Sequence, residues 1–567
     1  MKSFLLKAVA LLSCIALCAS FLASCSKNDP TELSSPEQIC PISAVNQKAT
    51  DDEKIIIAYD ISEDVAAAYD RFEVRVFHDD SYNNLLATTA VDPAQKTTYI
   101  DASYGKIRME LVGVKASDSS ATVLGTGKTA VWADEYNFAS LNATFPVVYF
   151  TLELFSMNGD SKANFEAANA NGKNIQFLSD APTFVSLERT AAYDWTKLPD
   201  KVHTLPNAPY ADTIVGDFHS MNTKMEEYIK ELYEVNPNSK FNFYCVDNAP
   251  SLIVRFFIAQ GIENYSATMI SDGTASVQAF RDLYEGADAE AVYNDTKIAW
   301  ETIKAKAASG DPTYLENIPH EESPFLWHYA LTMANEEENV QWWCSRDNFT
   351  KVTESQYMKD LLATMKGTKI QYFGINDMLS NLSQNDQTHL KELFHFDGEM
   401  FAAAEQSGKQ ALMIIGTYPE ENLEGYLKLL QVEYGDEFVI YYKGHPAYPT
   451  QLDANKQQMF VDNGIIDIDA TIAAELILFY CPDIYLTGYP STTFKSALEG
   501  KFLAMFDQTK ESGTQNAIEN GYSDMPDAFY LTVEAAGKKF VQIESAANDT
   551  VRYFDIAEGV FVDTLPQ

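Results

Sequence analysis

From residue 146 onward, short apolar runs alternate with longer segments that have helical periodicity. Apolar runs without a polar face are typical of strands that are buried on both sides, as in a parallel sheet covered by helices. Strands that alternate with helices in this way predict a parallel α/β architecture. The alternation falls into two clusters, which indicates two Rossmann-like domains whose ligand lies at the carboxyl ends of their strands.

The apolar runs and their periods locate the expected elements. Strands are expected at residues 147–152, 241–246, 267–270, 411–415, 438–442, 483–487 and 502–506. Helices are expected at residues 221–233, 275–307, 353–366, 421–434, 471–480 and 492–499. We assign residues 146–407 to an N-terminal and 408–525 to a C-terminal Rossmann-like domain, and we expect residues 526–567 to pack back on the N-terminal one. No GxGxxG or Walker A sequence occurs, so neither a dinucleotide site nor a P-loop is indicated.

The region before residue 146 has a different pattern, with a period of two. Residues 54–59 and 72–77 alternate apolar and polar side chains, and clusters of Asp, Ser and Gly separate further runs of this kind. About seven short strands within residues 41–145 predict a small all-β sandwich of the immunoglobulin type. The region contains no cluster of titratable side chains, so we expect it to be a spacer or accessory module.

The first 25 residues have the layout of a bacterial lipoprotein signal. Lys2 and Lys7 accompany an apolar run, residues 8–23, that is too short for a comfortable membrane span. The run ends in Leu22-Ala23-Ser24-Cys25, which resembles a lipobox, where the cysteine is diacylated and becomes the first residue. A plain signal peptide is the alternative. With residues 26–40 as a tether, we expect a protein anchored by lipid in the bacterial cell envelope, at the outer membrane or the periplasmic face.

The charge balance excludes one class of partner. The chain has 41 basic and 81 acidic side chains, a formal net charge of −40. A nucleic acid as the main partner needs clustered cations, whereas an anionic small molecule needs only a local positive pocket. The cysteines beyond residue 25 are widely separated and form no CxxC pair, so no zinc or redox site is indicated.

Two polar segments follow predicted strands and carry candidate chemistry. Ser271-Asp272-Gly273 brings a carboxylate to the edge of a sheet, although an ordinary Asp-Gly turn is the alternative. Lys443-Gly444-His445-Pro446 leaves a second strand. Its imidazole can donate a proton near neutral pH, and its lysine can offset the charge of a phosphate. A surface histidine beside a lysine is the alternative.

Two further segments are associated with predicted helices. Ser491 and Thr492 stand where a helix is expected to start, so their hydroxyls and the free N–H groups can bind a phosphate. Helix capping alone is the alternative. Glu475 interrupts an apolar helix face, where its carboxylate can accept hydrogen bonds from both hydroxyls of a ribose. A solvated helix residue is the alternative.

In their order and spacing these segments resemble the bacterial sialyltransferases of the Pasteurella and Photobacterium type, glycosyltransferase family 80. The family pattern is Asp-Asp-Gly, then Lys-Gly-His-Pro, then a Ser-Ser pair before a helix. The similarity extends over residues 147–567, and Gly416-Thr417 looks like the turn that opens the family's nucleotide domain. The resemblance implies a GT-B fold with an acceptor domain and a CMP-sugar domain, preceded in several members by an immunoglobulin-like domain.

The resemblance also implies an activity: transfer of sialic acid from CMP-sialic acid to a terminal sugar hydroxyl, as of a galactoside, with inversion. Asp272 would be the base and His445 the acid at the departing phosphate. No metal or cofactor is implied, and we interpret Asp467-Ile468-Asp469 as a polar turn before a helix. The residues implied to bind the CMP-sugar are Lys443, Gly444, Pro446, Glu475, Ser491, Thr492, Gly416 and Thr417.

The chain departs from the family pattern at several positions. Ser271 replaces the first Asp and Thr492 the second Ser, Ala447 stands where the family often has an acceptor-binding Arg, and residues 248–251 lack the family's acceptor-pocket His. The donor side is thus kept and the acceptor side altered. The alternatives are a transferase or hydrolase for another CMP-linked acidic sugar, and a glycan-binding surface lipoprotein without catalysis.

The lipobox generates a first prediction. Cys25→Ala should move the protein from the membrane fraction to the soluble fraction, because the acceptor of the lipid is lost. Fractionation of cells after a high-salt wash, followed by immunoblotting, measures this. Equal membrane association of the two forms would refute the lipid anchor.

Overall fold

The structure of the chain is a computed structural model. It describes residues 39–79, 84–117, 119–141, 143–172, 178–186, 193–199, 201–205, 223–247, 250–271, 273–314, 329–344, 349–372, 374–417, 419–445, 453–498, 500–522, 525, 527–533 and 537–565. Cys25 and nearly all of the predicted tether lie outside the described residues. Among the described residues, no helix combines the length and the apolar character that a membrane crossing requires.

The first compact unit consists of strands from residues 39–135 together with Glu227–Ser239. One antiparallel sheet has the order β1 (Ile42–Ala44), β2 (Lys54–Tyr59), β5 (Thr97–Asp101). The other has the order β4 (Leu85–Val91), β3 (Arg71–His78), β6 (Gly105–Val114), β7 (Ala121–Val131), and a short helix, α2 (Glu63–Ala68), lies between β2 and β3. Alternate residues of β2 and β3 are buried, as the period-two pattern predicts.

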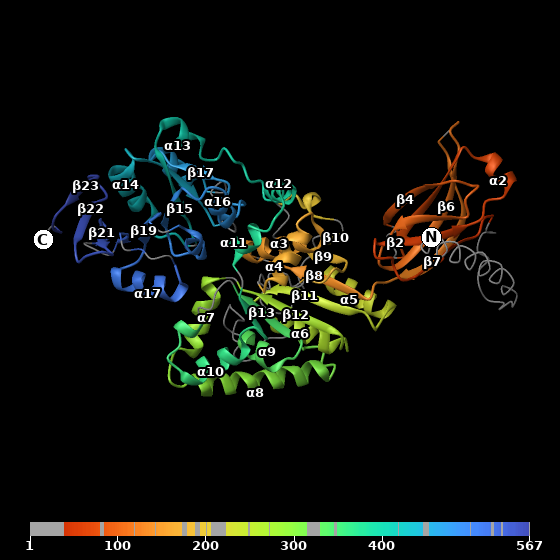
Figure 1. Ribbon diagram of the computed structural model, residues 1–567, viewed down its shortest axis with the longest axis horizontal. Coiled ribbons are helices and arrows are strands. Elements are labelled where there is room, and N and C mark those ends of the chain that lie inside the picture. The colour runs from red at the N-terminus through yellow and green to blue at the C-terminus, as the bar shows by residue number, and fades with distance from the viewer. Residues whose placement is uncertain are drawn as a thin grey trace. The chain divides into compact units, whose positions relative to one another are not determined.

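The second unit contains two sheets, of which the first has seven strands. Its order is β10 (Val202–Leu205), β9 (Thr183–Ser186), β8 (Glu135–Ser140), β11 (Lys240–Val246), β12 (Tyr265–Ile270), β13 (Val340–Cys344), β14 (Ile370–Tyr372). The register is parallel wherever it is described. The helices of this half are α3 (Thr144–Asn158), α4 (Lys162–Ala170), α6 (Pro250–Ala259), α7 (Thr274–Tyr284), α8 (Ala289–Ala308), α9 (Ala330–Glu336), α10 (Gln356–Met365), α11 (Ile375–Leu379) and α12 (Gln384–Leu393) (Figure 1). Helix α5 (Thr223–Val235) precedes β11.

The prediction of a strand at residues 147–152 is wrong, because these residues lie within α3. Eleven consecutive residues of this helix, Pro146 to Ser156, are buried. A helix that is buried all round has no polar face, so its sequence loses the helical period and reads like a strand. The strand that opens the sheet is β8, which lies in the region assigned to the sandwich, and the α/β part therefore begins about ten residues earlier than predicted.

The second sheet of this unit has nine strands. Its order is β17 (Ile466–Ile468), β16 (Phe438–Lys443), β15 (Gln410–Ile415), β18 (Tyr485–Gly488), β19 (Phe502–Phe506), β20 (Phe529–Thr532), β21 (Phe540–Ser545), β22 (Val551–Asp555), β23 (Val560–Val562). It is parallel from β17 to β20 and antiparallel from there on. Its helices are α13 (Ala402–Ser407), α14 (Leu423–Tyr434), α15 (Ala454–Asp462), α16 (Ala474–Tyr480) and α17 (Lys510–Asn520).

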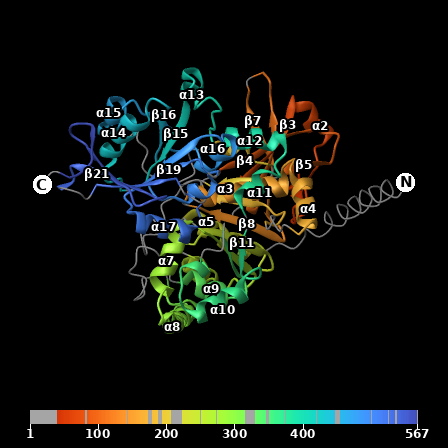
Figure 2. The same cartoon turned by 60° about the vertical axis from the view of Figure 1, so that its left-hand side comes forward.

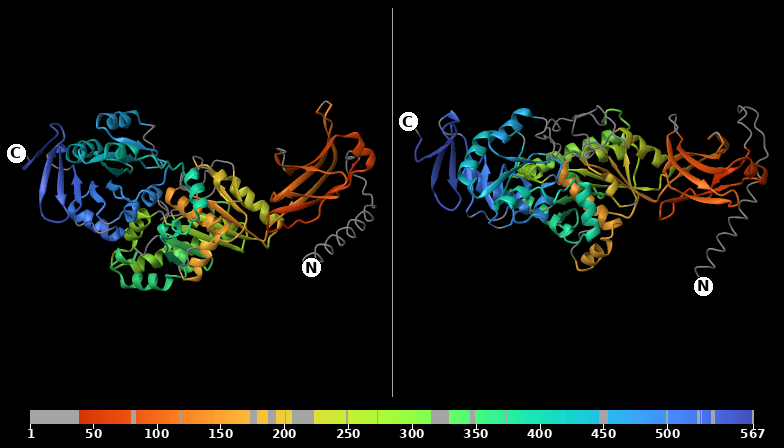
Figure 3. Two further views of the ribbon diagram at one scale, coloured as in Figure 1. Left: turned by 45° about the horizontal axis from the view of Figure 1, so that its top comes forward. Right: turned by 90° about the horizontal axis from the view of Figure 1, so that it is seen from above.

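The prediction for residues 526–567 is also wrong. These residues pack on the second half, where strands β20 to β23 extend its sheet, as Figure 3 shows in blue. Strand β20 pairs in parallel with the edge of β19, and β21 to β23 continue from β20 as antiparallel neighbours. Local sequence periodicity does not reveal which sheet edge such strands join.

Two separate hydrophobic clusters cover the faces of the nine-stranded sheet. One contains residues of α13 and α16 with Tyr441, and the other contains residues of α14 and α15 with Tyr442. Figure 2 labels these helices together with β15 and β16. Successive residues of β16 therefore point to opposite faces, as the pleat requires. This alternation determines which face of the sheet each side chain near the end of β16 lies on.

The position of β8 generates a second prediction. Asn242 on β11 donates to Asn137 Oδ1 on β8 at 3.0 Å, and β8 lies between β9 and β11 in the sheet. A shortened chain that starts at Pro146 lacks this strand, so it should unfold at a lower temperature than one that starts at Ala133. Both chains lack residues 1–132, so thermal unfolding followed by circular dichroism tests the segment that contains β8. Equal midpoints would contradict its role.

Candidate functional site

Three adjacent parallel strands end together in the second half. Ile415 at the end of β15 is in register with Lys443 on β16 and with Gly488 on β18. The backbone beyond the strands stays joined, because Gly416 N donates to Lys443 O at 2.9 Å and Tyr489 N donates to Ile415 O at 3.0 Å. The segments that start at Gly416, Gly444 and Tyr489 therefore share one edge of the sheet, as predicted for a Rossmann-like domain.

Lys443 is a buried cation at this edge. Its side chain is 3% exposed, and Nζ donates to the carbonyls of Gly444 at 2.9 Å and Ala470 at 2.8 Å. Burial lowers its pKa to about 8, while the nearby carboxylates, Glu475 first among them, oppose the shift. The strand thus holds an ammonium group out of water with two carbonyl partners.

Glu475 lies in the first turn of α16 and is buried as well, so the alternative of a solvated helix residue is wrong. Burial raises the pKa of its carboxyl group, and the charge of Lys443 acts against this rise. The hydroxyl of Thr493 donates to Glu475 Oε1 at 3.4 Å. Lys443 and Glu475, two of the residues that the family resemblance assigns to the CMP-sugar, are therefore electrostatically coupled.

The hydroxyl segment after β18 differs from the expected helix. Residues Thr492–Ser496 form a 3₁₀ helix of five residues instead of an α-helix over 492–499. Two β-branched threonines at its start disfavour an α-helix. Ser491 Oγ accepts from Thr493 N at 3.3 Å and donates to Thr493 Oγ1 at 3.1 Å. Ser491 thus caps the segment as predicted, but the hydroxyl beside it and Glu475 is that of Thr493, which the sequence analysis did not single out.

His445 follows β16 by two residues and is the last residue of the described range 419–445. Its side chain is exposed. The surrounding protein and the positive charge of Lys443 both lower its pKa, which favours the neutral imidazole at pH 7. Pro446 and Ala447, which follow it, lie outside the described residues.

The acidic segment of the first half contacts the hydroxyl segment of the second half. Ser271 follows β12, and its N–H donates to Trp343 O at 2.9 Å, while its hydroxyl accepts from Gly273 N at 3.1 Å. Gly273 has a φ of 93°, and a Cβ atom at this position would overlap the methyl group of Thr492. Asp272 itself lies outside the described residues, but the residues on both sides of it are described.

A second contact joins the two halves near this point. Arg281 in α7 donates to Glu519 Oε2 in α17 at 2.5 Å, and Gln515 donates to the other oxygen of Glu519 at 2.6 Å. Helix α7 follows Gly273 directly. The ion pair therefore fixes the helix that continues the acidic segment to the half that carries the hydroxyl segment.

Asp247 is a further candidate that the sequence analysis missed. It follows β11 directly, is fully buried, and accepts a hydrogen bond from Trp342 Nε1 at 2.9 Å. Since β11 and β12 are parallel neighbours, Asp247 lies at the same edge as Ser271. The signal was present, because Asp247 follows a buried strand just as the Asp272 segment does. Asn248 and Ala249, near the missing family histidine, lie outside the described residues.

The interpretation of Asp467 and Asp469 as a turn is right only for the second of them. Asp467 lies within strand β17, whereas the carboxylate of Asp469 accepts from Thr471 N at 2.9 Å and from Thr471 Oγ1 at 2.8 Å. Within the described ranges, no group of three or more His, Cys, Asp or Glu side chains has a metal-binding arrangement.

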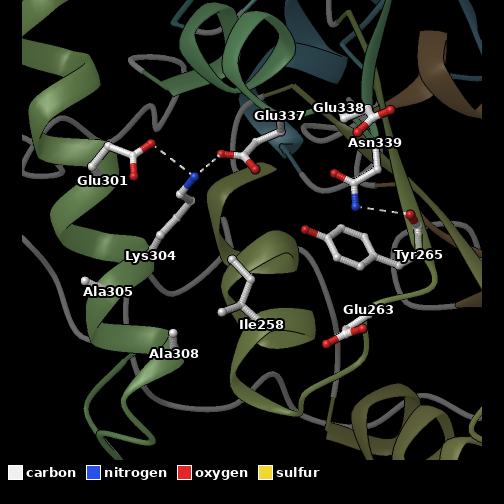
Figure 4. A pocket seen from close by; sticks show the side chains of 10 residues that line it. All are labelled: Ile258, Glu263, Tyr265, Glu301, Lys304, Ala305, Ala308, Glu337, Glu338 and Asn339. Atoms are coloured by element: carbon white, nitrogen blue, oxygen red, sulfur yellow. Dashed lines mark hydrogen bonds and ion pairs between the residues drawn. The ribbon is translucent and has the colours of Figure 1, made fainter.

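An open pocket of about 590 Å³ lies elsewhere in the first half (Figure 4). Its lining includes Tyr265 at the start of β12 and Asn339 just before β13, so it is at the amino ends of the strands. Lys304 bridges Glu301 and Glu337 across it. The pocket is thus at the opposite edge of the sheet from Asp247 and Ser271.

No family model and no curated protein matches the chain. Among solved structures, it is similar to an α/β-galactoside α-2,3-sialyltransferase from the marine bacterium Photobacterium phosphoreum, with 14% identity, 68% of this chain and 96% of that chain covered, and a TM-score of 0.50. The chain has the GT-B fold. The 2,6-sialyltransferase of Photobacterium sp. JT-ISH-224 aligns with 11% identity over 81% of this chain and 94% of that chain, with a TM-score of 0.49. In GT-B terms, Ser271 follows a strand of one Rossmann-like half, Gly416, Gly444 and Tyr489 follow strands of the other, and Gly273 contacts Thr492 between the halves.

The buried Lys443 generates a third prediction. Its pKa is about 8 in the folded chain and 10.5 as the ordinary value, so between these pH values the unfolded chain binds more protons and stability rises with pH. From pH 7 to pH 9.5 the free energy of unfolding should gain about 2 kcal/mol more in the wild type than in Lys443→Met. Urea unfolding at the two pH values measures the difference. The same gain in both proteins would contradict the assignment.

Proposed function

We propose that the chain is a glycosyltransferase that moves sialic acid from CMP-sialic acid to a sugar hydroxyl of a glycan, such as a galactoside. The observation that carries this proposal is the contact of Gly273 with Thr492. It sets the flanks of Asp272 against the hydroxyl segment after β18. That segment leaves the same sheet edge as Lys443-Gly444-His445 after β16, with β15 between the two strands. Facing acidic and phosphate-binding segments on two halves of a GT-B fold are what a nucleotide-sugar transferase requires. The similar fold of the Photobacterium phosphoreum sialyltransferase supports the proposal.

In this proposal Asp272 is the general base. Its carboxylate takes the proton of the acceptor hydroxyl while the acceptor oxygen forms a bond to the anomeric carbon of sialic acid. The bond from that carbon to the phosphate oxygen breaks, and its electron pair leaves with CMP. Attack opposite the leaving group inverts the anomeric centre. A general base of this kind contributes about 10²–10⁴-fold to the rate.

His445 is proposed to act on the leaving phosphate. In the chain without ligand, Lys443 and desolvation favour its neutral form. The negative charge of a bound CMP phosphate would raise its pKa, so the ring can donate a hydrogen bond or a proton to the departing oxygen. Ser491, Thr492 and Thr493 supply hydroxyls for the same phosphate.

The remaining donor contacts follow the family resemblance. Lys443, Gly444 and Pro446 would line the cytidine, and Glu475 would accept from the ribose hydroxyls. Gly416 and Thr417 lie at the shared strand edge, beside Lys443, and would border the nucleotide. The Thr493 hydroxyl donates to Glu475 Oε1 at 3.4 Å, so a ribose would compete with this hydroxyl for the carboxylate.

The proposed reaction uses no metal or other cofactor. The transition state resembles an oxocarbenium ion that carries its own carboxylate, so the donor neutralises part of the developing charge. We further propose that the enzyme acts at the cell envelope, held to the membrane by a lipid on Cys25. The donor would then have to reach an extracytoplasmic site.

The test is incubation of the wild-type protein with CMP-sialic acid, with and without lactose, followed by chromatography of CMP and of the sugar products. The proposal expects CMP release together with sialylated lactose. Release of CMP without a lactose product would indicate a hydrolase. Absence of CMP release in both reactions would overturn the proposal and favour glycan binding without turnover.

The role of Asp272 is the fourth prediction. Asp272→Asn should lower kcat by about 10²–10⁴-fold, because the amide cannot accept the proton, while the dissociation constant of CMP stays near the wild-type value. Steady-state kinetics and calorimetric titration measure the two quantities. Asp282→Asn, an exposed position in the following helix, is the matched control and should keep the wild-type rate. Near wild-type transfer by Asp272→Asn would remove it as the base.

A further inference from the structure

A buried ionic cluster lies beside the turn that follows β15. Glu420 in this turn and Lys456 in the first turn of α15 form an ion pair whose side chains are 9% and 14% exposed. The Tyr442 hydroxyl donates to Glu420 Oε1 and accepts from Lys456 Nζ at 2.6 Å. Burying an ion pair costs desolvation free energy that the attraction between its partners only partly offsets, so such a cluster is weak as a device for stability alone.

The cluster holds the backbone of the turn in one position. Glu420 Oε1 also accepts from Thr417 N at 3.2 Å, and a Cβ atom at Gly416 would overlap both the Tyr442 hydroxyl and the Glu420 carboxylate. On the other side, the Tyr489 hydroxyl donates to Glu421 O at 2.5 Å. The turn after β15 is thus held by tyrosine side chains from the ends of the two strands that flank β15, Tyr442 of β16 and Tyr489 after β18.

The partners of the cluster come from three different segments of the second half. Thr417 is in the turn after β15, Tyr442 directly precedes Lys443, and Lys456 comes shortly after the chain leaves His445. The ammonium of Lys456 also lies 4.5 Å from the centre of the Tyr442 ring, a cation–π distance. One carboxylate, that of Glu420, therefore links the turn after β15, strand β16 and helix α15 through side-chain contacts.

We propose that Glu420, Lys456 and Tyr442 are positioning residues that hold the CMP-binding segments in their bound arrangement before the donor arrives. This inference rests on the proposed function. None of the three needs to touch the donor, because the cluster acts through the backbone of Gly416 and Thr417 and through the neighbouring Lys443. A site arranged in advance binds more tightly, since less ordering accompanies binding.

Removing one charge of the ion pair should weaken CMP binding more than removing both charges. In Lys456→Met the Glu420 carboxylate stays buried without its cation, where burial already raises its pKa, and it would draw the turn toward water. In the double variant Glu420→Gln/Lys456→Met no charge is left, and the amide oxygen can still accept from Thr417 N and Tyr442 Oη. Lys456→Arg keeps the charge and serves as the conservative variant.

The experiment is calorimetric titration of the full chain with CMP. Lys456→Met should weaken CMP binding by about tenfold or more, whereas the double variant and Lys456→Arg should bind within about threefold of the wild type. Arg552→Met is the control, because it breaks an ion pair between α14 and β22, Arg552 with Glu433 at 2.9 Å, that lies away from the strand ends. Circular dichroism confirms that each variant is folded, and Tyr442→Phe replaces any variant that is not.

The outcomes separate this inference from the proposed function. A wild type that binds no CMP overturns both. Wild-type binding that is unchanged in Lys456→Met and Tyr442→Phe overturns the positioning role alone. An equal loss of affinity in Arg552→Met, or a double variant as weak as Lys456→Met, also overturns it, since the effect would then follow general stability or the loss of the lysine itself.

Discussion

Hydrogen-bonded parallel strands must end at a common edge of their sheet, and this constraint gathers the candidate residues of the second unit. Ile415, Lys443 and Gly488 are in register, so the three segments that follow them leave the sheet side by side. In the first half the same rule puts Asp247 beside Ser271. The two edges meet where Gly273 packs on Thr492, at a glycine whose lack of a side chain makes room for the contact. The chemistry thus depends on backbone pairing before it depends on any catalytic side chain.

The pleat of β16 adds a second level of organisation. Lys443 is directed to the face covered by α16, where it is coupled to Glu475, and Tyr442 to the face covered by α15, where it meets Glu420 and Lys456. The strand therefore carries one buried charged group on each side of the sheet. In a chain of net charge −40, each group pairs one of the 41 basic side chains with a carboxylate, Lys443 with Glu475 and Lys456 with Glu420.

The sequence predicted the buried strands and the residues at their ends, but not helix α3 or the side-chain clusters, and the reason is physical in each case. Strands such as β11, β15, β16 and β19 have apolar runs that bury both faces, and the residues after them could be identified as edge residues from the pattern alone. Helix α3 could not be identified from the pattern, because burial on all sides removes the helical period of its sequence. The clusters at Thr493 and Glu420 arise from side chains that are 18 and 36 residues distant from their partners, and such pairings leave no trace in local periodicity. Asp272, Pro446 and Cys25 lie outside the described residues, and their roles stay predictions.

Helix α3 has a consequence for how the chain reaches this structure. Its buried stretch has no face that tolerates water, so it cannot rest half-packed on an incomplete sheet as an amphipathic helix can. Until the surrounding layer of sheet and helices has formed, the segment exposes a largely apolar surface, the kind that associates between chains. Refolding yield should therefore depend on protein concentration, with self-association through residues 146–156 competing against completion of the core.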